Sequence, residues 1–175
     1  MTNIIGIAGS LRSNSINRNL LEALAAHSRS VRFEVFAALA EVPLFNEDLE
    51  DPAPAGVRRL WNAVRGANIV VFATPEYNQS LPGVLKNALD WLTRDPAGSP
   101  LRGKPCAVTG ATVGRWGTRI AQQQLKTVLM TCGAKILTTP VLFHADGMTS
   151  EPTEQVLRQF MEALIAEDGL FMRAA

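Results

Sequence analysis

TPEYNQSLPG, residues 74–83, is the stretch that decides the fold of this chain. It follows an apolar run at residues 69–73, IVVFA, which is typical of a fully buried strand. Residues 84–92 come next, and their apolar positions recur at helical spacing. Residues 74–83 are therefore expected to form a strand-to-helix loop. Open α/β sheets bind their ligands at such loops, outside the carboxyl ends of the strands.

The side chains of this loop favour a ligand site over a plain connection. An ordinary connection is short and made of turn residues, whereas this loop carries an aromatic ring, a carboxylate and an amide. Two prolines, Pro75 and Pro82, stiffen the backbone on either side. The alternative is a well-capped helix entry, with Ser80 near the N-cap and Pro82 in the first turn.

Composition limits the class of protein. The 175 residues are 47% apolar and 19% charged, which predicts one globular domain over residues 1–175. A formal net charge of +1 argues against nucleic-acid binding through a broad basic patch. No apolar run approaches the roughly 20 residues that cross a bilayer, and the amino terminus lacks a signal-peptide layout. We therefore expect no membrane contact and a cytoplasmic location.

Cysteines and histidines do not indicate a metal site. Cys106 and Cys132 are too few and too far apart for zinc, and both lie in patterns typical of core residues. His27 and His144 have no neighbouring side chain at ligand spacing, so we expect them to be structural or surface residues.

Strand and helix patterns alternate along the chain. The strands are predicted at residues 3–8, 31–39, 69–73, 104–109 and, in two pieces, 135–137 and 141–143. The helices are predicted at residues 19–26, 54–65, 84–92, 118–131 and 154–167. In the last helix, Val156, Phe160, Ala163 and Leu164 are expected to face the core. This alternation predicts an α/β fold: a flavodoxin-like, doubly wound, five-stranded parallel sheet with helices on both faces.

The loop after the first strand is rich in hydrogen-bond donors. It leads into a helix amino terminus, where free N–H groups and the helix dipole favour an anion. Its polar residues are Ser10, Arg12, Ser13, Asn14, Ser15 and Asn17. No acidic residue occurs before Glu22, and neither the Walker pattern nor the dinucleotide glycine triplet is present. The loop therefore predicts a site for a terminal monophosphate, and the alternative is a helix cap of ordinary serine and asparagine.

Residues 9–17 (GSLRSNSIN) together with residues 74–91 (TPEYNQSLPGVLKNALDW) resemble the NAD(P)H-dependent FMN reductase family, which includes bacterial quinone, azo-dye and chromate reductases. The resemblance covers nearly the whole chain and implies FMN as cofactor with NAD(P)H as co-substrate. It implies that the FMN phosphate is held by Ser10, Arg12, Ser15 and Asn17, with Ile16 beside them. It implies that the isoalloxazine is lined by Pro75, Glu76, Tyr77 and Asn78, with Ser80 nearby, and by Gly110, Ala111 and Thr112 at its other edge.

The resemblance also implies a mechanism. Hydride would pass from the nicotinamide through FMN to a small acceptor such as a quinone, an azo dye, chromate or free flavin, with ping-pong kinetics. The flavin carries the hard chemistry, and we assign no general acid or base, because a quinone or dye can draw protons from water. Tyr77 is either a positioning residue or simply packed at the loop, and Glu76 is expected to cap a helix or pair at an interface. The alternatives are a flavodoxin-type electron carrier, which a charge of +1 fits poorly, and a binding protein for another phosphorylated ligand.

Two features bear on substrates and assembly. The family often has paired small glycines where this chain reads GRWG at residues 114–117, so Trp116 either borders the substrate space or packs in a subunit interface. Residues 43–45 and the pair Trp91 and Leu92 are expected to expose apolar surface near the site. Together with the resemblance, this predicts a homodimer or homotetramer.

Overall fold

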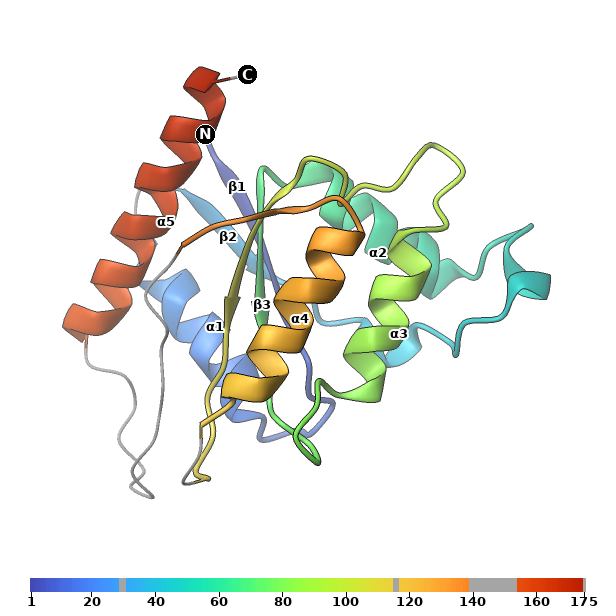
Figure 1. Cartoon of the computed structure of the whole chain (residues 1–175), viewed down its shortest axis with the longest axis horizontal. Coiled ribbons are helices and arrows are strands. Elements are labelled where there is room, and N and C mark those ends of the chain that lie inside the picture. The colour runs from blue at the N-terminus through green and yellow to red at the C-terminus, as the bar shows by residue number, and fades with distance from the viewer. Residues whose placement is uncertain (29–30, 115–116, 139–153, 175) are drawn as a thin grey trace.

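The computed structural model of the chain describes residues 1–28, 31–114, 117–138 and 154–174, and is built on a five-stranded parallel sheet (Figure 1). The strands are β1 (Asn3–Ala8), β2 (Arg32–Val35), β3 (Ile69–Ala73), β4 (Pro105–Thr109) and β5 (Lys135–Ile136). Their order across the sheet is β2-β1-β3-β4-β5, and every neighbouring pair is parallel. This is the flavodoxin-like order, so the predicted fold class is confirmed.

Helices cover both faces of the sheet. They are α1 (Ile16–Ala26), α2 (Ala55–Gly66), α3 (Gly83–Leu92), α4 (Arg119–Thr131) and α5 (Glu154–Ala174), with short 3-10 turns η1 (Leu39–Glu41) and η2 (Glu47–Leu49). The helices α1 and α5 share one apolar core with the sheet, while α2, α3 and α4 share the other. Figure 1 shows α1 and α5 together on the left and α2 with α3 on the right.

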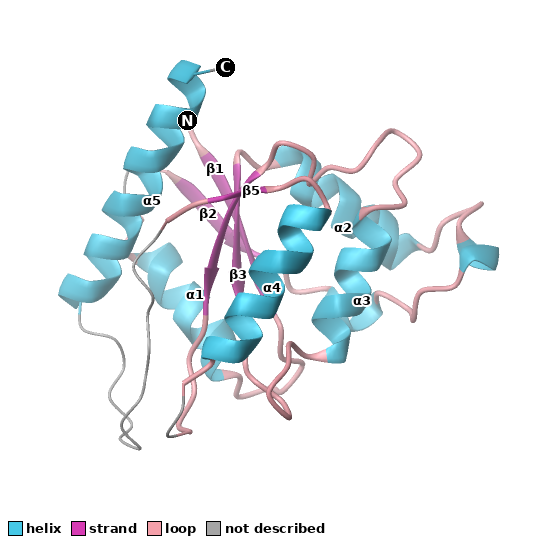
Figure 2. Cartoon of the chain, viewed as in Figure 1, coloured by secondary structure: helices cyan, strands magenta, loops and turns pink. Residues whose placement is uncertain are grey.

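The central strand β3 shows why the sheet forms. All five of its residues are fully buried, and successive side chains point to opposite cores. Val70 and Phe72 pack toward α2 and α3, whereas Ile69 and Val71 pack toward α1 and α5. A strand covered by helices on both faces needs a continuous apolar run, as the IVVFA segment provides. In Figure 2 the carboxyl ends of the central strands point downward, toward a group of loops.

The start of the first helix and the end of the second strand differ from their predictions by several residues. The first helix begins at Ile16, three residues earlier than expected, because Ser15 caps it with its Oγ accepting the Arg18 N–H at 3.2 Å. The second strand ends at Val35 rather than Leu39, because the apolar alternation stops there. Leu39 instead begins η1 and is buried in the core shared with α2.

The last helix differs from its prediction in length and in rotation. It extends to Ala174, and its buried face is formed by Leu157, Phe160, Met161 and Leu164, a spacing of three, one and three residues. Val156 is 37% exposed, so its predicted place in the core is wrong by one position. The predicted strand piece 141–143 lies outside the described residues. Within the described ranges no helix, α5 included, combines the length and the apolar character needed to cross a bilayer.

The apolar surface predicted at residues 43–45 and at the end of α3 is largely absent. Trp91 and Leu92 are fully buried, and the Phe45 ring packs edge-on against Trp91 with centroids 5.0 Å apart. The Pro43 carbonyl accepts hydrogen bonds from Trp91 Nε1 at 2.9 Å and from Asn87 Nδ2 at 2.8 Å. The segment therefore folds back onto α3, and of residues 43–45 only Leu44, 83% exposed, leaves a large apolar side chain in solvent.

Candidate functional site

The loops that follow β1, β3 and β4 meet at the carboxyl edge of the sheet. Hydrogen bonds join them there: the Gly9 N–H donates to the Ala73 carbonyl at 2.8 Å, and the Thr74 N–H donates to the Thr109 carbonyl at 2.9 Å. The three loops that carry the expected cofactor-binding residues are therefore neighbours in space, as the strand order predicts.

Glycine lets these loops approach one another closely. A Cβ at Gly9 would lie 3.0 Å from Leu85 Cδ2 and 3.3 Å from the Pro75 ring. A Cβ at Gly110 would lie 2.4 Å from the Thr74 carbonyl oxygen and 2.2 Å from Thr118 Oγ1, which no side chain tolerates. Gly110 therefore fixes the loop after β4 between the loop after β3 and the start of α4.

The loop after β1 presents free donors. The Ile16 and Asn17 N–H groups open α1, and in the part of the chain that the structure describes neither has an acceptor. The Arg12 side chain is exposed and, within the same residues, pairs with no carboxylate. The first turn of α1 contains no acidic residue. Such a set of unpaired N–H groups and a guanidinium fits a phosphate dianion.

Two serines shape this loop. Ser15 is 2% exposed and caps α1, so the capping alternative from the sequence holds for this residue. Ser10 is 6% exposed, and its Oγ accepts a long 3.5 Å hydrogen bond from the Arg12 N–H. Each hydroxyl accepts a hydrogen bond but can still donate its own proton, so both can add to the donors of this loop.

The loop after β3 contains a tight, strained turn. Tyr77 and Ser80 exchange two backbone hydrogen bonds of 3.0 Å, and the residues between them, Asn78 and Gln79, have φ of 50° and 58°. This left-handed pair has the positive φ angles of a type I′ turn, which favours asparagine or glycine first and glycine second, so Gln79 is the residue held in an unfavourable conformation. Strained non-glycine backbone of this kind clusters at functional sites. The Tyr77 side chain is 48% exposed on this turn, so it stays accessible rather than packed away.

Glu76 ties the same loop to α4. Its Oε2 accepts the Ile120 N–H at 2.9 Å and the Ala121 N–H at 3.0 Å, across 44 and 45 residues of sequence. The carboxylate therefore caps the amino terminus of α4, where the helix dipole favours a negative charge. The expectation that Glu76 caps a helix is confirmed.

A second tie involves Gln124, a residue that the sequence did not reveal. Ser80 Oγ donates to Gln124 Oε1 at 2.7 Å, and Gln124 Nε2 donates to the Gln79 carbonyl at 3.1 Å. The N-cap of α3 is Pro82 and not Ser80, so the capping alternative for Ser80 is wrong. Gln124 is one of three consecutive glutamines at 122–124. Nothing in the sequence distinguishes it from a helix residue that faces solvent.

The loop after β4 is held by α1. Asn17 Nδ2 donates to the Ala111 carbonyl at 2.9 Å, and the Ala111 N–H donates to Asn17 Oδ1 at 2.9 Å. Thr112 Oγ1 accepts the Gly114 N–H at 3.0 Å. Beside them the fully buried Thr109 Oγ1 has no partner among the described residues, so a polar atom is left over next to Gly110. Trp116 lies outside the described residues.

The described groups with shifted pKa values lie toward the opposite edge of the sheet. Burial raises the pKa of the Cys106 thiol, near the start of β4, to about 12 and also raises the pKa of Cys132 at the end of α4. Burial lowers the pKa of Lys104, and hydrogen bonding to Glu50 raises that of Arg94 beyond the end of α3. Cys106 is fully buried and Cys132 packs against the core, which confirms both as core residues.

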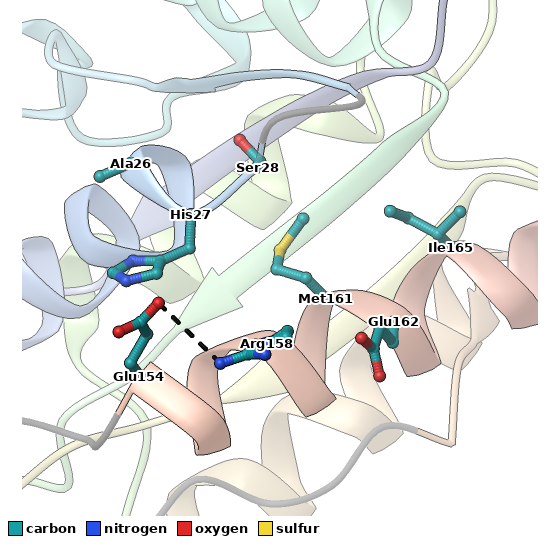
Figure 3. Close-up of a pocket in the computed structure, with 8 residues that line it drawn as sticks. All are labelled: Ala26, His27, Ser28, Glu154, Arg158, Met161, Glu162 and Ile165. Atoms are coloured by element: carbon teal, nitrogen blue, oxygen red, sulfur yellow. Dashed lines mark ion pairs between the residues drawn. The ribbon is translucent and has the colours of Figure 1, made fainter.

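A hollow of about 550 Å³ lies away from the three loops, between the carboxyl end of α1 and α5 (Figure 3). Figure 3 shows His27 above it and Glu154, Arg158 and Glu162 along α5. His27 is exposed, as expected, and its Nδ1 lies 2.8 Å from the Ala23 carbonyl oxygen, while Glu154 and Arg158 form an ion pair at 3.9 Å. His27, Glu154 and Arg158 therefore already have partners, and we do not assign the hollow as the ligand site.

Comparison with known proteins agrees with this geometry. The family model for NADPH-dependent FMN reductase matches residues 2–149. The chain is 38% identical over 172 residues to an NAD(P)H-dependent FMN reductase of Pseudomonas aeruginosa, covering 92% of each protein. It is 36% identical over 169 residues to a 2-hydroxy-1,4-benzoquinone reductase of a Burkholderia species, covering 91% of this chain and 92% of the relative. A quinone reductase of Escherichia coli is 36% identical over 179 residues, covering 97% of this chain and 95% of that protein.

Solved structures show the same architecture. FerB of Paracoccus denitrificans, described as a flavoenzyme NAD(P)H:(acceptor) oxidoreductase, superposes with a TM-score of 0.78 at 29% identity, covering 98% of this chain and 95% of FerB. RosB, solved with bound 8-demethyl-8-formylriboflavin-5′-phosphate, gives a TM-score of 0.75 at 15% identity, covering 99% of this chain and 81% of RosB. At that identity the likeness to RosB concerns the fold alone.

Proposed function

The chain belongs to the NADPH-dependent FMN reductase family, with FMN as cofactor and NAD(P)H as co-substrate, and we propose that it is a cytoplasmic reductase of a small planar acceptor such as a quinone. The observation that carries the proposal is the set of free donors at the start of α1, beside the strained turn after β3. When bound, FMN supplies the chemistry, because it accepts a hydride from one molecule and returns it to another.

The residues divide between the two ends of the cofactor. The Arg12 guanidinium, the hydroxyls of Ser10 and Ser15, and the backbone N–H groups of Ile16 and Asn17 would hold the phosphate. The ring system would lie against Pro75, Glu76, Tyr77, Asn78 and Ser80, with Gly110, Ala111 and Thr112 at its far edge. Glu76 and Ser80 act in this arrangement by fixing the loop, since both side chains are bonded to α4.

Exposed apolar side chains surround this place. They lie on all three loops and on the first turn of α4: Leu11 (50% exposed), Tyr77 (48%), Val113 (64%) and Ile120 (44%). Such a rim suits an apolar acceptor, and it also suits a second subunit. We propose a homodimer or homotetramer formed across this rim. The surface expected at Trp91 and Leu92 cannot serve, because both residues are buried. Light scattering that gives 18.9 kDa at micromolar concentration would remove the oligomer proposal.

The three loops are pressed together at Gly9 and Gly110, so we infer that nicotinamide and acceptor use one open face in turn. Two substrates that share one place cannot be bound together, so the initial rates should follow ping-pong kinetics. Double-reciprocal plots for NAD(P)H against a benzoquinone should give parallel lines. Anaerobic NAD(P)H alone should remove the visible absorbance of the bound flavin. Intersecting lines would require a second binding place, and no loss of absorbance with either nicotinamide would reject the reductase proposal.

A further inference from the structure

Asn17 makes a contact that its expected role as a phosphate ligand does not explain. The resemblance placed it beside the phosphate, yet its side chain is 3% exposed and directed to a different loop. Both of its polar atoms bond to one residue, Ala111, which lies 94 positions further along the chain and is itself 4% exposed.

The pairing is specific to an amide side chain. The carbonyl oxygen of the Asn17 amide accepts the Ala111 N–H, while its NH₂ group donates to the Ala111 carbonyl, both at 2.9 Å. The amide cannot be turned over, because that would set donor against donor and acceptor against acceptor. Aspartate has the same shape but no donor, so it would place an oxygen against the Ala111 carbonyl.

The same loop is held from its other side. At Gly110 the backbone is packed so closely against the Thr74 carbonyl and Thr118 Oγ1 that no Cβ fits. Residues 110–111 therefore lie between α1 on one side and the start of α4 on the other. Since Asn17 stands in the first turn of α1, a group bound by that turn and a group bound by the loop after β4 share one support.

We propose that Asn17 is a positioning residue, which fastens the loop after β4 to the first turn of α1 and so holds the ring end of the flavin site in its binding conformation. This inference rests on the proposed flavin site. It assigns the Asn17 side chain to the ring end of the ligand, acting through Ala111, and leaves only its backbone N–H to the phosphate.

The test compares FMN with riboflavin, which has the ring system without the phosphate. Asn17→Ala should weaken both ligands by the same factor, about tenfold, because two buried hydrogen bonds that hold the ring end are lost. Asn17→Asp should weaken riboflavin to a similar degree, although riboflavin carries no charge for the new carboxylate to repel. A loss confined to FMN would make the Asn17 side chain a phosphate ligand and overturn the proposal, as would unchanged affinity for both.

Amide hydrogen exchange gives a second readout that needs no flavin. In the apo protein, Asn17→Ala should speed exchange of the Ala111 N–H at least tenfold while the Val71 N–H in β3 stays unchanged. If the variants do not fold, wild-type protein can be measured with and without inorganic phosphate, which should slow exchange at Ala111. Exchange at Ala111 that responds to neither change overturns the proposal. Wild-type protein that binds neither flavin would instead reject the proposed function, and the exchange measurement would still decide the role of Asn17.

Discussion

The loops after β1 and after β3 border the same candidate site but are built in opposite ways. The loop after β3 is fastened to α4 by hydrogen bonds of three side chains. Glu76 and Ser80 belong to the loop, and Gln124 belongs to α4. In the loop after β1, by contrast, the guanidinium of Arg12 and two backbone N–H groups have no partner among the described residues.

The difference indicates how the cofactor would be recognised. A planar ring is bound best by a surface that is already rigid, because little ordering entropy is then lost on binding. A phosphate dianion brings strong acceptors of its own, so the donors that bind it need no partner within the protein. The fastened loop should therefore govern stability in the absence of flavin, and the free loop should govern affinity.

Arg12→Ala should give the largest effect. It removes a charge-assisted hydrogen bond worth about 1.5–3 kcal/mol, so FMN affinity should fall roughly 10- to 150-fold while riboflavin affinity barely changes. Fluorescence titration with both ligands measures this. Arg102→Ala is the matched control, since it removes the same charge from an exposed residue before β4, toward the amino edge. Equal losses for both ligands would place Arg12 away from the phosphate.

Glu76→Ala should affect the apo protein instead. The carboxylate caps two N–H groups of α4, and losing a cap of this kind costs about 1–2 kcal/mol in the free energy of unfolding. Glu76→Gln keeps an acceptor but loses the charge, so its free energy of unfolding should lie between those of the wild type and Glu76→Ala. Urea unfolding without flavin measures both, with the exposed Glu22→Ala as control, for which about 0.5 kcal/mol or less is expected. A destabilisation that occurs only in the FMN-bound protein would contradict the fastened-loop interpretation.

The sequence predicted those parts of the molecule whose signal is local. The buried run at 69–73 and the helical spacing at 84–92 were enough for β3 and α3, and the order of elements was enough for the topology. The free donors at the start of α1 were expected because a helix amino terminus follows the first strand. The capping role of Glu76 could be expected from its position in a loop, but its partner α4 could not.

What the sequence missed depends on contacts between distant segments. Gln124 and the pairing of Asn17 with Ala111 join residues 44 to 94 positions apart, and ordinary polar residues do not reveal such partners. The burial of Trp91 was missed for the same reason, because the ring that packs on it belongs to Phe45, in a loop whose sequence predicts exposure. In α5, one residue of rotation moved Val156 out of the core, because apolar residues on both sides of the buried face allow either choice.

The hydrogen bond between Ser80 and Gln124 should give the smallest effect and the finest test of the comparison. A double-mutant cycle with Ser80→Ala and Gln124→Ala isolates the pair, because the helix preference of alanine at position 124 and the lost contact to the Gln79 carbonyl cancel. We expect a coupling free energy of about 0.5–1.5 kcal/mol from urea unfolding. The decisive point is its dependence on ligand. A loop that is already fastened gives the same coupling with and without saturating FMN, whereas coupling that arises only with FMN would mean that the cofactor, and not α4, orders the turn.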